Sequence, residues 1–348
     1  MTTNGTATLS GNLKLAYIDS GLVEGSNNYT TVILLHGSTF NAYTYDRVHE
    51  LASPRNLRTI AVQRREYPGS TPYTDEEIDD IKNGRQVFID RTAILMAEFI
   101  QFVAQTLKVP EVSENGSSGG IALLGWSIGA VTAMAPLSKP ELLPNDLRTT
   151  LEKYFRMVIM LDPPHYAHGF TLPDSLTFVI PAQLSSLEAF YESFKGSVIG
   201  YYNTPEGWGG DISLLDRRTP AEAAYTPHAW STEDYAKRYT IQAGVRSEFF
   251  TQLRTMKSIF EENSRRALFN EHLAQTFCPR VSIGILSVGR SHWICQYSAY
   301  RTQELYKELT EKGEKLRPLK VYHIQCGNHF THYHYPEDFM DGLKALLS

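Results

Sequence analysis

The chain has few cysteines, no disulfide pattern and an opening stretch unlike a secretory signal. Its three cysteines, Cys278, Cys295 and Cys326, are an odd number without metal-ligand spacing, so we expect reduced thiols. The opening stretch, MTTNGTATLSGN, lacks both the basic and the apolar region of a secretory signal. These absences together predict an intracellular, cytoplasmic protein.

Long apolar runs and an excess of positive charge are also missing. Runs such as Thr31–Leu35 and Met157–Leu161 fall far short of the ~18 residues that a membrane span requires. The 33 basic and 38 acidic residues give a net charge of −5 without any basic block, which argues against a nucleic-acid partner. No phosphate-binding glycine-rich loop is present, so no cofactor is implied. The expected partner is a small-molecule substrate, with monomer and homodimer both left open.

What the sequence does contain is an alternation of short buried strands with helices. At 348 residues, with 42% hydrophobic and 20% charged, the chain is that of a folded protein with a sizeable core. Helical spacing of apolar residues predicts helices over Asp90–Leu107, Ile128–Leu137 and Glu337–Leu347. The predicted strands are Leu13–Tyr17 (at an edge), Thr31–Leu35, Thr59–Val62, Ile121–Leu124, Met157–Leu161, Val281–Val288 and Leu319–Gln325. This order predicts an α/β fold with a doubly wound, mostly parallel sheet.

The alternation stops between residues 163 and 277. Helical stretches are predicted there over Ser185–Phe194, Thr232–Leu253 and Ser258–His272. We therefore expect a core of 1–162 and 278–348 with a helical cap inserted at 163–277. The aromatic side chains of this insertion suit a roof over a bulky, partly apolar substrate, although each one singly is more typical of a core. They are Tyr166, Phe170, Phe178, Phe190, Tyr191, Tyr201, Tyr202, Trp208, Tyr225 and Trp230.

Chemistry is indicated most sharply by Gly125-Trp126-Ser127-Ile128-Gly129, between a buried strand and a helix of small residues. A turn this tight needs glycine on both sides of the serine, and it raises the serine hydroxyl at the helix N-terminus. Ser127 is thus a candidate nucleophile, and Trp126 is expected to serve packing. The alternative is an ordinary strand–helix turn capped by a serine.

A histidine that could activate Ser127 follows the last predicted strand, in Cys326-Gly327-Asn328-His329-Phe330. Because a serine alone is a poor nucleophile, we interpret His329 as its general base. His332 and His334 complete an H-x-x-H-x-H pattern, but zinc sites of that kind usually sit on a helix or hairpin with a carboxylate or thiolate nearby. This stretch instead follows a strand and carries Phe, Tyr and Pro. We therefore expect no metal and assign both histidines to the surface or to a supporting role.

The turn His36-Gly37-Ser38-Thr39, after the strand Thr31–Leu35, is the third signal. A glycine here lets the backbone approach the site closely. The amides of Ser38 and Ile128 are then expected to donate to a developing oxyanion, with the amide of Thr39 as the alternative to Ser38.

With these three motifs the chain resembles the α/β-hydrolase superfamily of the serine type, with a lid inserted after the sixth strand. The resemblance runs from about Leu13 to about Leu347 and implies a Ser–His–acid triad. It departs from the commonest pattern at the acid, because no Asp or Glu stands between Arg280 and Arg301 and His292 occupies the usual turn. The superfamily's other acid position is the end of the sixth strand, where Asp162 stands. If Asp162 is only a turn residue before prolines, the site is a dyad or takes a carboxylate from the cap.

The resemblance also narrows the reaction. Epoxide hydrolases and haloalkane dehalogenases of this superfamily carry Asp at the elbow, whereas this chain has Ser127. We therefore expect a serine hydrolase that cleaves an ester or lactone of a bulky, partly apolar small molecule through an acyl-enzyme. A C–C bond hydrolase, lyase or cyclase of a biosynthetic pathway would use the same residues. From another class, a ligand receptor without turnover would keep the fold alone.

Overall fold

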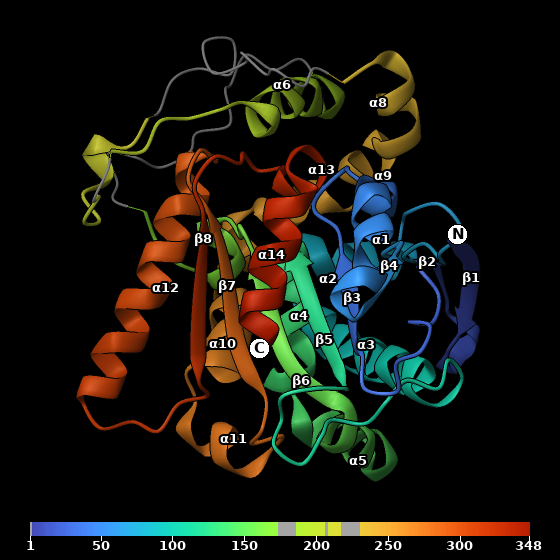
Figure 1. The fold of residues 1–348 in the computed structure, drawn as a ribbon. Helices are drawn as coiled ribbons and strands as arrows, with labels where there is room; N and C mark the ends of the chain where they lie inside the picture. The colour runs from blue at the N-terminus through green and yellow to red at the C-terminus, as the bar shows by residue number, and fades with distance from the viewer. Residues whose placement is uncertain (1, 173–185, 206–207, 217–229) are drawn as a thin grey trace.

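Eight strands form a single sheet through the middle of the molecule (Figure 1). The computed structural model describes residues 2–172, 186–205, 208–216 and 230–348. The strand order is β1-β2-β4-β3-β5-β6-β7-β8. The strands are β1 (Thr3–Thr8), β2 (Lys14–Asp19), β3 (Thr30–Leu35), β4 (Leu57–Val62), β5 (Ile121–Trp126), β6 (Phe155–Leu161), β7 (Ser282–Val288) and β8 (Leu319–Ile324).

Pairing within the sheet is parallel from β4 through β8, and only β2 runs antiparallel to its neighbours β1 and β4. This confirms the predicted doubly wound, mostly parallel α/β fold. One detail of the prediction is wrong, because β1 pairs outside β2 and takes the sheet edge. The polar stretch of β1 has no buried alternation to announce it, and its Gly5 lies opposite Tyr17, whose ring covers it.

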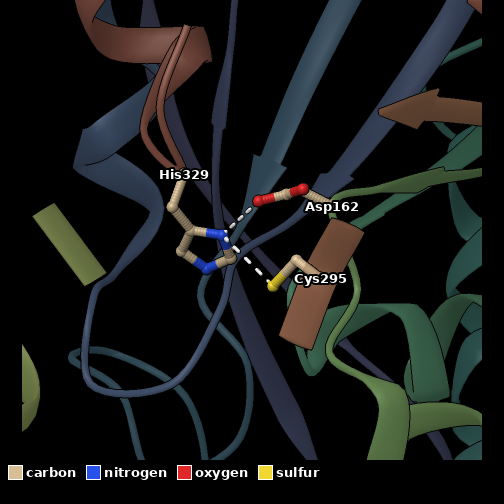
Figure 2. A group of neighbouring side chains, drawn as sticks. All are labelled: Asp162, Cys295 and His329. Carbon is tan, nitrogen blue, oxygen red and sulfur yellow. Dashed lines mark hydrogen bonds and ion pairs between the residues drawn. The ribbon is translucent and has the colours of Figure 1, made fainter. Parts of the chain in front are cut away.

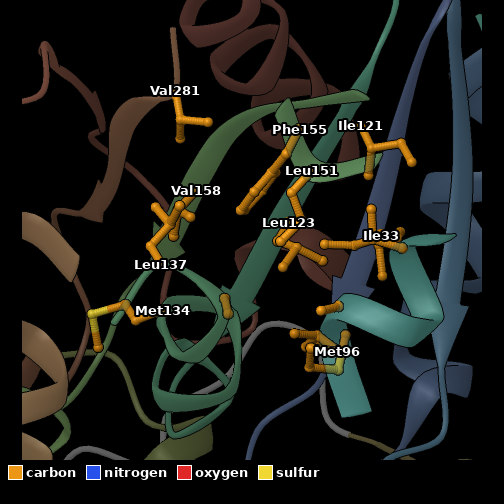
Figure 3. Close-up of a cluster of buried hydrophobic side chains, with 14 of the residues drawn as sticks. Ile33, Met96, Ile121, Leu123, Met134, Leu137, Leu151, Phe155, Val158 and Val281 are labelled. Atoms are coloured by element: carbon orange, nitrogen blue, oxygen red, sulfur yellow. The ribbon is translucent and has the colours of Figure 1, made fainter. Parts of the chain in front are cut away.

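Both faces of the sheet are buried, as a continuously apolar strand requires. In β3, Ile33 and Leu35 enter one core cluster while Val32 and Leu34 enter the other. Figure 3 shows the first cluster, in which Ile33 and Leu123 of the sheet meet Met96 and Met134. The helices of that face are α3 (Val87–Gln105), α4 (Gly129–Ser138), α5 (Asn145–Tyr154) and α10 (Lys257–Leu268).

The second face is covered by α1 (Asp46–Ala52) and α14 (Pro336–Leu347), which also pack against each other. The long helix α12 (Trp293–Glu311) connects β7 to β8. Shorter helices are α2 (Asp75–Lys82), α11 (Glu271–Thr276) and α13 (Thr331–His334). None of the helices in the described ranges is both long and apolar enough to cross a bilayer.

The cap helices α6 (Leu187–Ile199), α8 (Thr232–Arg238) and α9 (Ile241–Arg246) lie beyond one end of the sheet (Figure 1). That end is the carboxyl end of β3, because the Thr240 amide donates to the Thr39 carbonyl at 2.6 Å and the Asn41 amide to the Arg238 carbonyl at 2.9 Å. The division into core and cap stays a prediction, but α10 packs on α4 and its Ala267 and Leu268 lie in the sheet-side core. This packing places α10 with the core helices rather than over the site.

The predicted helix Thr232–Leu253 is interrupted. It consists of α8, α9 and a 3-10 turn at Glu248–Gln252, and Tyr239 between α8 and α9 is extended. An isolated β-bridge joins Tyr239 to Phe40 in the loop after β3. The helical periodicity was therefore real, but pairing with a distant loop overrides it at residues 239–240.

Candidate active site

Ser127 and Ile128 lie between the end of β5 and the start of α4, and Ser127 has a left-handed backbone (φ 55°). The residues two positions before and after it must be glycines, because a Cβ on Gly125 would lie 2.5 Å from the Ala130 amide nitrogen and one on Gly129 would lie 2.7 Å from the Leu35 carbonyl oxygen. The Ser127 amide donates to the Leu161 carbonyl of the neighbouring strand at 2.9 Å. The strained elbow expected from the glycine pattern is thus present, with Ser127 at the carboxyl edge of the sheet.

Asp162 and His329 meet at the same edge, although 167 residues separate them (Figure 2). Asp162 directly follows β6 and His329 follows β8, so parallel strands bring both to one place. The His329 Nδ1 atom lies 2.6 Å from Asp162 Oδ2, and both side chains are almost completely buried. A carboxylate that accepts from Nδ1–H leaves Nε2 of the ring as the basic nitrogen.

Two further side chains converge on this pair. The Ser291 hydroxyl donates to Asp162 Oδ2, and Cys295 Sγ of α12 lies 3.9 Å from His329 Nδ1 (Figure 2). Burial raises the pKa of the Cys295 thiol well above its usual range, and the Asp162 charge adds to the effect. The turn after β7 therefore contributes a hydroxyl, where the commonest arrangement has the acid. The potential metal-ligand atoms of Asp162, Cys295 and His329 lie within 4.8 Å of one another. The Nδ1 atom of His329, however, already bonds the Asp162 carboxylate and so is engaged.

The turn after β3 lies directly against the nucleophile candidate. A Cβ on Gly37 would lie 2.9 Å from the Ser127 Cβ, so only glycine permits this approach. The amides of the predicted donors Ser38 and Ile128 have no hydrogen-bond partner among the described residues. The amide of the alternative, Thr39, donates to the Tyr67 hydroxyl at 2.7 Å and to Glu248 Oε2 at 2.9 Å. Thr39 is therefore occupied, whereas Ser38 and Ile128 are available.

Within the described residues, no hydrogen bond joins the Ser127 hydroxyl to the His329 ring. Catalytic hydrogen bonds are often long before substrate binds, so this geometry is compatible with an acid–base pair waiting for its substrate. The two elements are nevertheless connected, because the Trp126 indole nitrogen donates to the His329 carbonyl at 2.9 Å. Trp126, expected only to pack, also ties the elbow to the histidine loop.

Comparison with known proteins identifies the family of this chain. The model of the alpha/beta hydrolase family matches residues 32–341. The chain belongs to the alpha/beta hydrolase family. Family and fold thereby confirm the resemblance seen in the motifs. No curated protein sequence matches the chain.

Solved structures with the same fold span this α/β hydrolase almost end to end. A putative aryl esterase from Burkholderia cenocepacia has 14% identity and a TM-score of 0.52, covering 99% of this chain and 98% of its own. An esterase from Exiguobacterium antarcticum has 15% identity and a TM-score of 0.52, covering 99% of both chains. The haloalkane dehalogenase DatA from Agrobacterium tumefaciens C58 has 13% identity and a TM-score of 0.55, covering 99% and 96%. At such identities the likeness concerns the fold alone.

His332 and His334, assigned to the surface or to a supporting role, are both buried in this α/β hydrolase. The His332 ring lies between Tyr45 and Trp126, with centroid separations of 4.7 and 4.4 Å. Burial holds the pKa of His332 well below 6.5, with the neighbouring histidines adding to the effect. His334 Nε2 accepts from the Trp230 indole at 3.0 Å. The surface assignment is wrong, and both histidines are packing residues behind the site.

The aromatic side chains of the predicted cap are mostly packed. Phe178 and Tyr225 lie outside the described residues. Trp230 packs on Phe330 and Tyr333 of the core, and Phe190 stacks against Phe194 within α6. The buried members of the predicted set are Phe190, Tyr191, Tyr201, Tyr202 and Trp230.

Two charged residues that contact the turn after β3, Arg64 at Gly37 and Glu248 at Thr39, were missed by the sequence reasoning. Arg64 lies in the polar turn after β4, and Glu248 lies in the interrupted helical stretch of the insertion. They form a largely buried ion pair. Arg64 carried a weak signal, because it follows a strand, whereas Glu248 reaches the site through tertiary packing.

Proposed function

We propose that this α/β hydrolase is a serine hydrolase that cleaves an ester or lactone of a bulky, partly apolar small molecule. One observation carries the proposal: the buried Asp162–His329 pair lies at the sheet edge where the strained elbow presents Ser127. A nucleophile, a base and an orienting acid in these roles are what acyl transfer to a serine needs. Ester or lactone is preferred to alkyl halide or epoxide because the elbow carries Ser127.

In the proposed reaction His329 Nε2 takes the Ser127 proton as Oγ attacks the substrate carbonyl carbon. Asp162 holds the ring in the tautomer with the proton on Nδ1 and stabilises the imidazolium that forms. The Ser38 and Ile128 amides stabilise the oxyanion. The leaving oxygen takes the proton from His329, and an acyl-enzyme remains. Water then attacks the acyl carbon with His329 as base, which releases the acid and restores Ser127.

The first test is hydrolysis of p-nitrophenyl acetate and butyrate by the wild type and by Ser127→Ala, His329→Ala and Asp162→Asn. We expect each variant to lose ~10²-fold or more in rate, because the three groups act as a unit. Circular dichroism of each variant controls for folding. If Asp162→Asn keeps the wild-type rate while the other two are inactive, the assignment of the acid fails.

Two further measurements separate the reaction classes. A fluorophosphonate should label the wild type stoichiometrically and leave Ser127→Ala unlabelled, and an unlabelled wild type would contradict a serine nucleophile. With a natural substrate in heavy-oxygen water, hydrolysis places one solvent oxygen in the product acid. A lyase or cyclase using the same residues places none.

A further inference from the structure

The orientation of the Ser38 amide is governed by the peptide group that it shares with Gly37. A trans peptide is planar, so its carbonyl oxygen and its N–H point in opposite directions. Whatever holds the Gly37 carbonyl therefore also aims the Ser38 N–H. The Gly37 carbonyl oxygen lies 2.9 Å from Arg64 Nη2 and 2.9 Å from His36 Nδ1.

His36 contributes a neutral donor to this carbonyl. Its Nε2 accepts from the Arg64 backbone amide at 3.1 Å, which leaves the ring proton on Nδ1, facing Gly37. Burial, with the Arg64 charge adding to it, holds the pKa of His36 well below 6.5, so the ring stays neutral. The charged donor is therefore Arg64.

Arg64 is in turn held by Glu248, which accepts from the Arg64 guanidinium through Oε1. Its other oxygen, Oε2, accepts from the Tyr67 hydroxyl at 2.7 Å and from the Thr39 amide at 2.9 Å. Thr39 has a left-handed backbone (φ 60°), which is costly for a β-branched residue and needs support from outside. The ion pair thus anchors the peptide groups on both sides of Ser38.

Burial makes this anchor rigid. The Glu248 side chain is 6% exposed and that of Arg64 is 14% exposed, so neither charge has much water as an alternative partner. Both residues line a small cavity of about 20 Å³ that also touches Ile128.

We propose that Arg64 and Glu248 are positioning residues that aim the Ser38 amide at the oxyanion, so that a residue beyond β6 sets the geometry of the turn after β3. The pair touches no reacting atom. Its contribution is the direction of one N–H, and it should appear in the transition state rather than in substrate binding. This inference rests on the proposed serine hydrolase function.

The test uses Glu248→Gln and Arg64→Lys with a p-nitrophenyl ester. The Arg64 Nη2 atom donates both to Gly37 and to Glu248. Lysine keeps the positive charge facing Glu248, but its side chain is one bond shorter and its nitrogen falls short of the Gly37 carbonyl. We expect kcat to fall ~10- to 100-fold in both variants, with KM changing less than about threefold, since loss of a complete oxyanion donor costs ~10²–10³. Affinity for a trifluoromethyl ketone, which forms a tetrahedral oxyanion on serine, should fall in parallel with kcat/KM.

Glu77→Gln is the matched control. Glu77 pairs with Arg65 in a similarly buried ion pair, at 2.6 Å, and the pair also bonds the backbone of Thr71, Pro72 and Thr74. Among the described residues it makes no hydrogen bond to Gly37 or Thr39. The Glu77→Gln variant should lose thermal stability as Glu248→Gln does but keep kcat and ketone affinity. If Glu248→Gln does not fold, Arg64→Lys decides alone.

The inference is overturned if Arg64→Lys or folded Glu248→Gln keeps wild-type kcat and ketone affinity. Loss of KM alone, or a loss of activity that Glu77→Gln shares, also overturns it by marking the pair as structural. Failure of the proposed function would give a different result, because Ser127→Ala would then hydrolyse the ester as fast as the wild type.

Discussion

At the scale of single residues, Trp126 shows how a packing side chain acquires a second task. Its ring fills the core behind the elbow, and its indole N–H is satisfied by the His329 carbonyl at 2.9 Å. A buried tryptophan almost always finds a partner for this group. Here the partner is the backbone of the proposed base, so the bond fixes the main chain from which the His329 ring extends.

Replacing Trp126 by Phe keeps most of the packing and removes the donor. We expect a loss of about 1 kcal/mol in stability and roughly a fivefold fall in kcat, the equivalent of one ordinary hydrogen bond. Trp230→Phe is the control, because its indole also donates to a buried partner, the His334 ring, and not to the His329 backbone. Equal kcat values for the two variants would show that the Trp126 bond serves stability alone.

The sequence allowed the positions of Ser127, Asp162 and His329 to be predicted because each follows a strand of a parallel sheet. Strand ends are local features, and the topology then brings them to one edge. Glu248 could not be predicted in this way. It contacts Thr39 across 209 positions of sequence, and no local pattern records such a contact.

At the scale of elements, the helical stretch 232–253 shows where periodicity stops being informative. Its apolar spacing is helical, yet α8 ends at Arg238 because residues 238–240 pair with the loop after β3. The strands β3, β5 and β6 were predictable, since each is apolar on both faces. The breaks in the insertion depend on what it covers, so the chain alone does not reveal them.

Because α9 packs on the same loop, we expect a glycine-to-alanine change in this helix to lower stability, although helix propensity alone favours alanine. Alanine is normally preferred to glycine in a helix by about 1 kcal/mol. A Cβ on Gly244, however, would lie 2.5 Å from Thr39 Cγ2 and 2.8 Å from the Tyr191 ring. We expect Gly244→Ala to destabilise the protein and to lower kcat, because α9 must move away from Thr39.

Gly342→Ala in α14 provides the comparison for this prediction. Its Cβ would meet the Tyr322 ring at 2.7 Å, far from the elbow, so stability should fall without any change in kcat. Thermal unfolding and steady-state kinetics on both variants distinguish the two. A Gly244→Ala protein with raised stability and unchanged kcat would show that α9 is not seated on the loop.

At the scale of the whole molecule, sensitivity to acid follows from histidines that the fold buries in neutral form. Burial lowers the pKa of His49, on α1, to about 4 and that of His168, beside α10, to about 3. Both side chains are almost fully buried, and one ring nitrogen of each has no partner among the described residues. Protonation therefore favours the unfolded chain, in which histidine titrates near 6.5.

The sign follows from proton counting. Between pH 6.5 and pH 4 the unfolded state binds a proton at His49 that the folded state does not, so stability is full above about pH 6.5 and falls as the pH drops. At pH 5 each of the two histidines should cost about 2 kcal/mol relative to pH 8. Urea unfolding at pH 8, 6 and 5 measures this loss of stability.

His49→Asn, which keeps a polar group near Thr59, should reduce the loss between pH 8 and pH 5 by about 2 kcal/mol, whereas His272→Asn, at an exposed position, should leave it unchanged. If His49→Asn loses as much stability as the wild type between pH 8 and pH 5, acid destabilises the protein through other groups, and the carboxylates of the ion pairs are the next candidates.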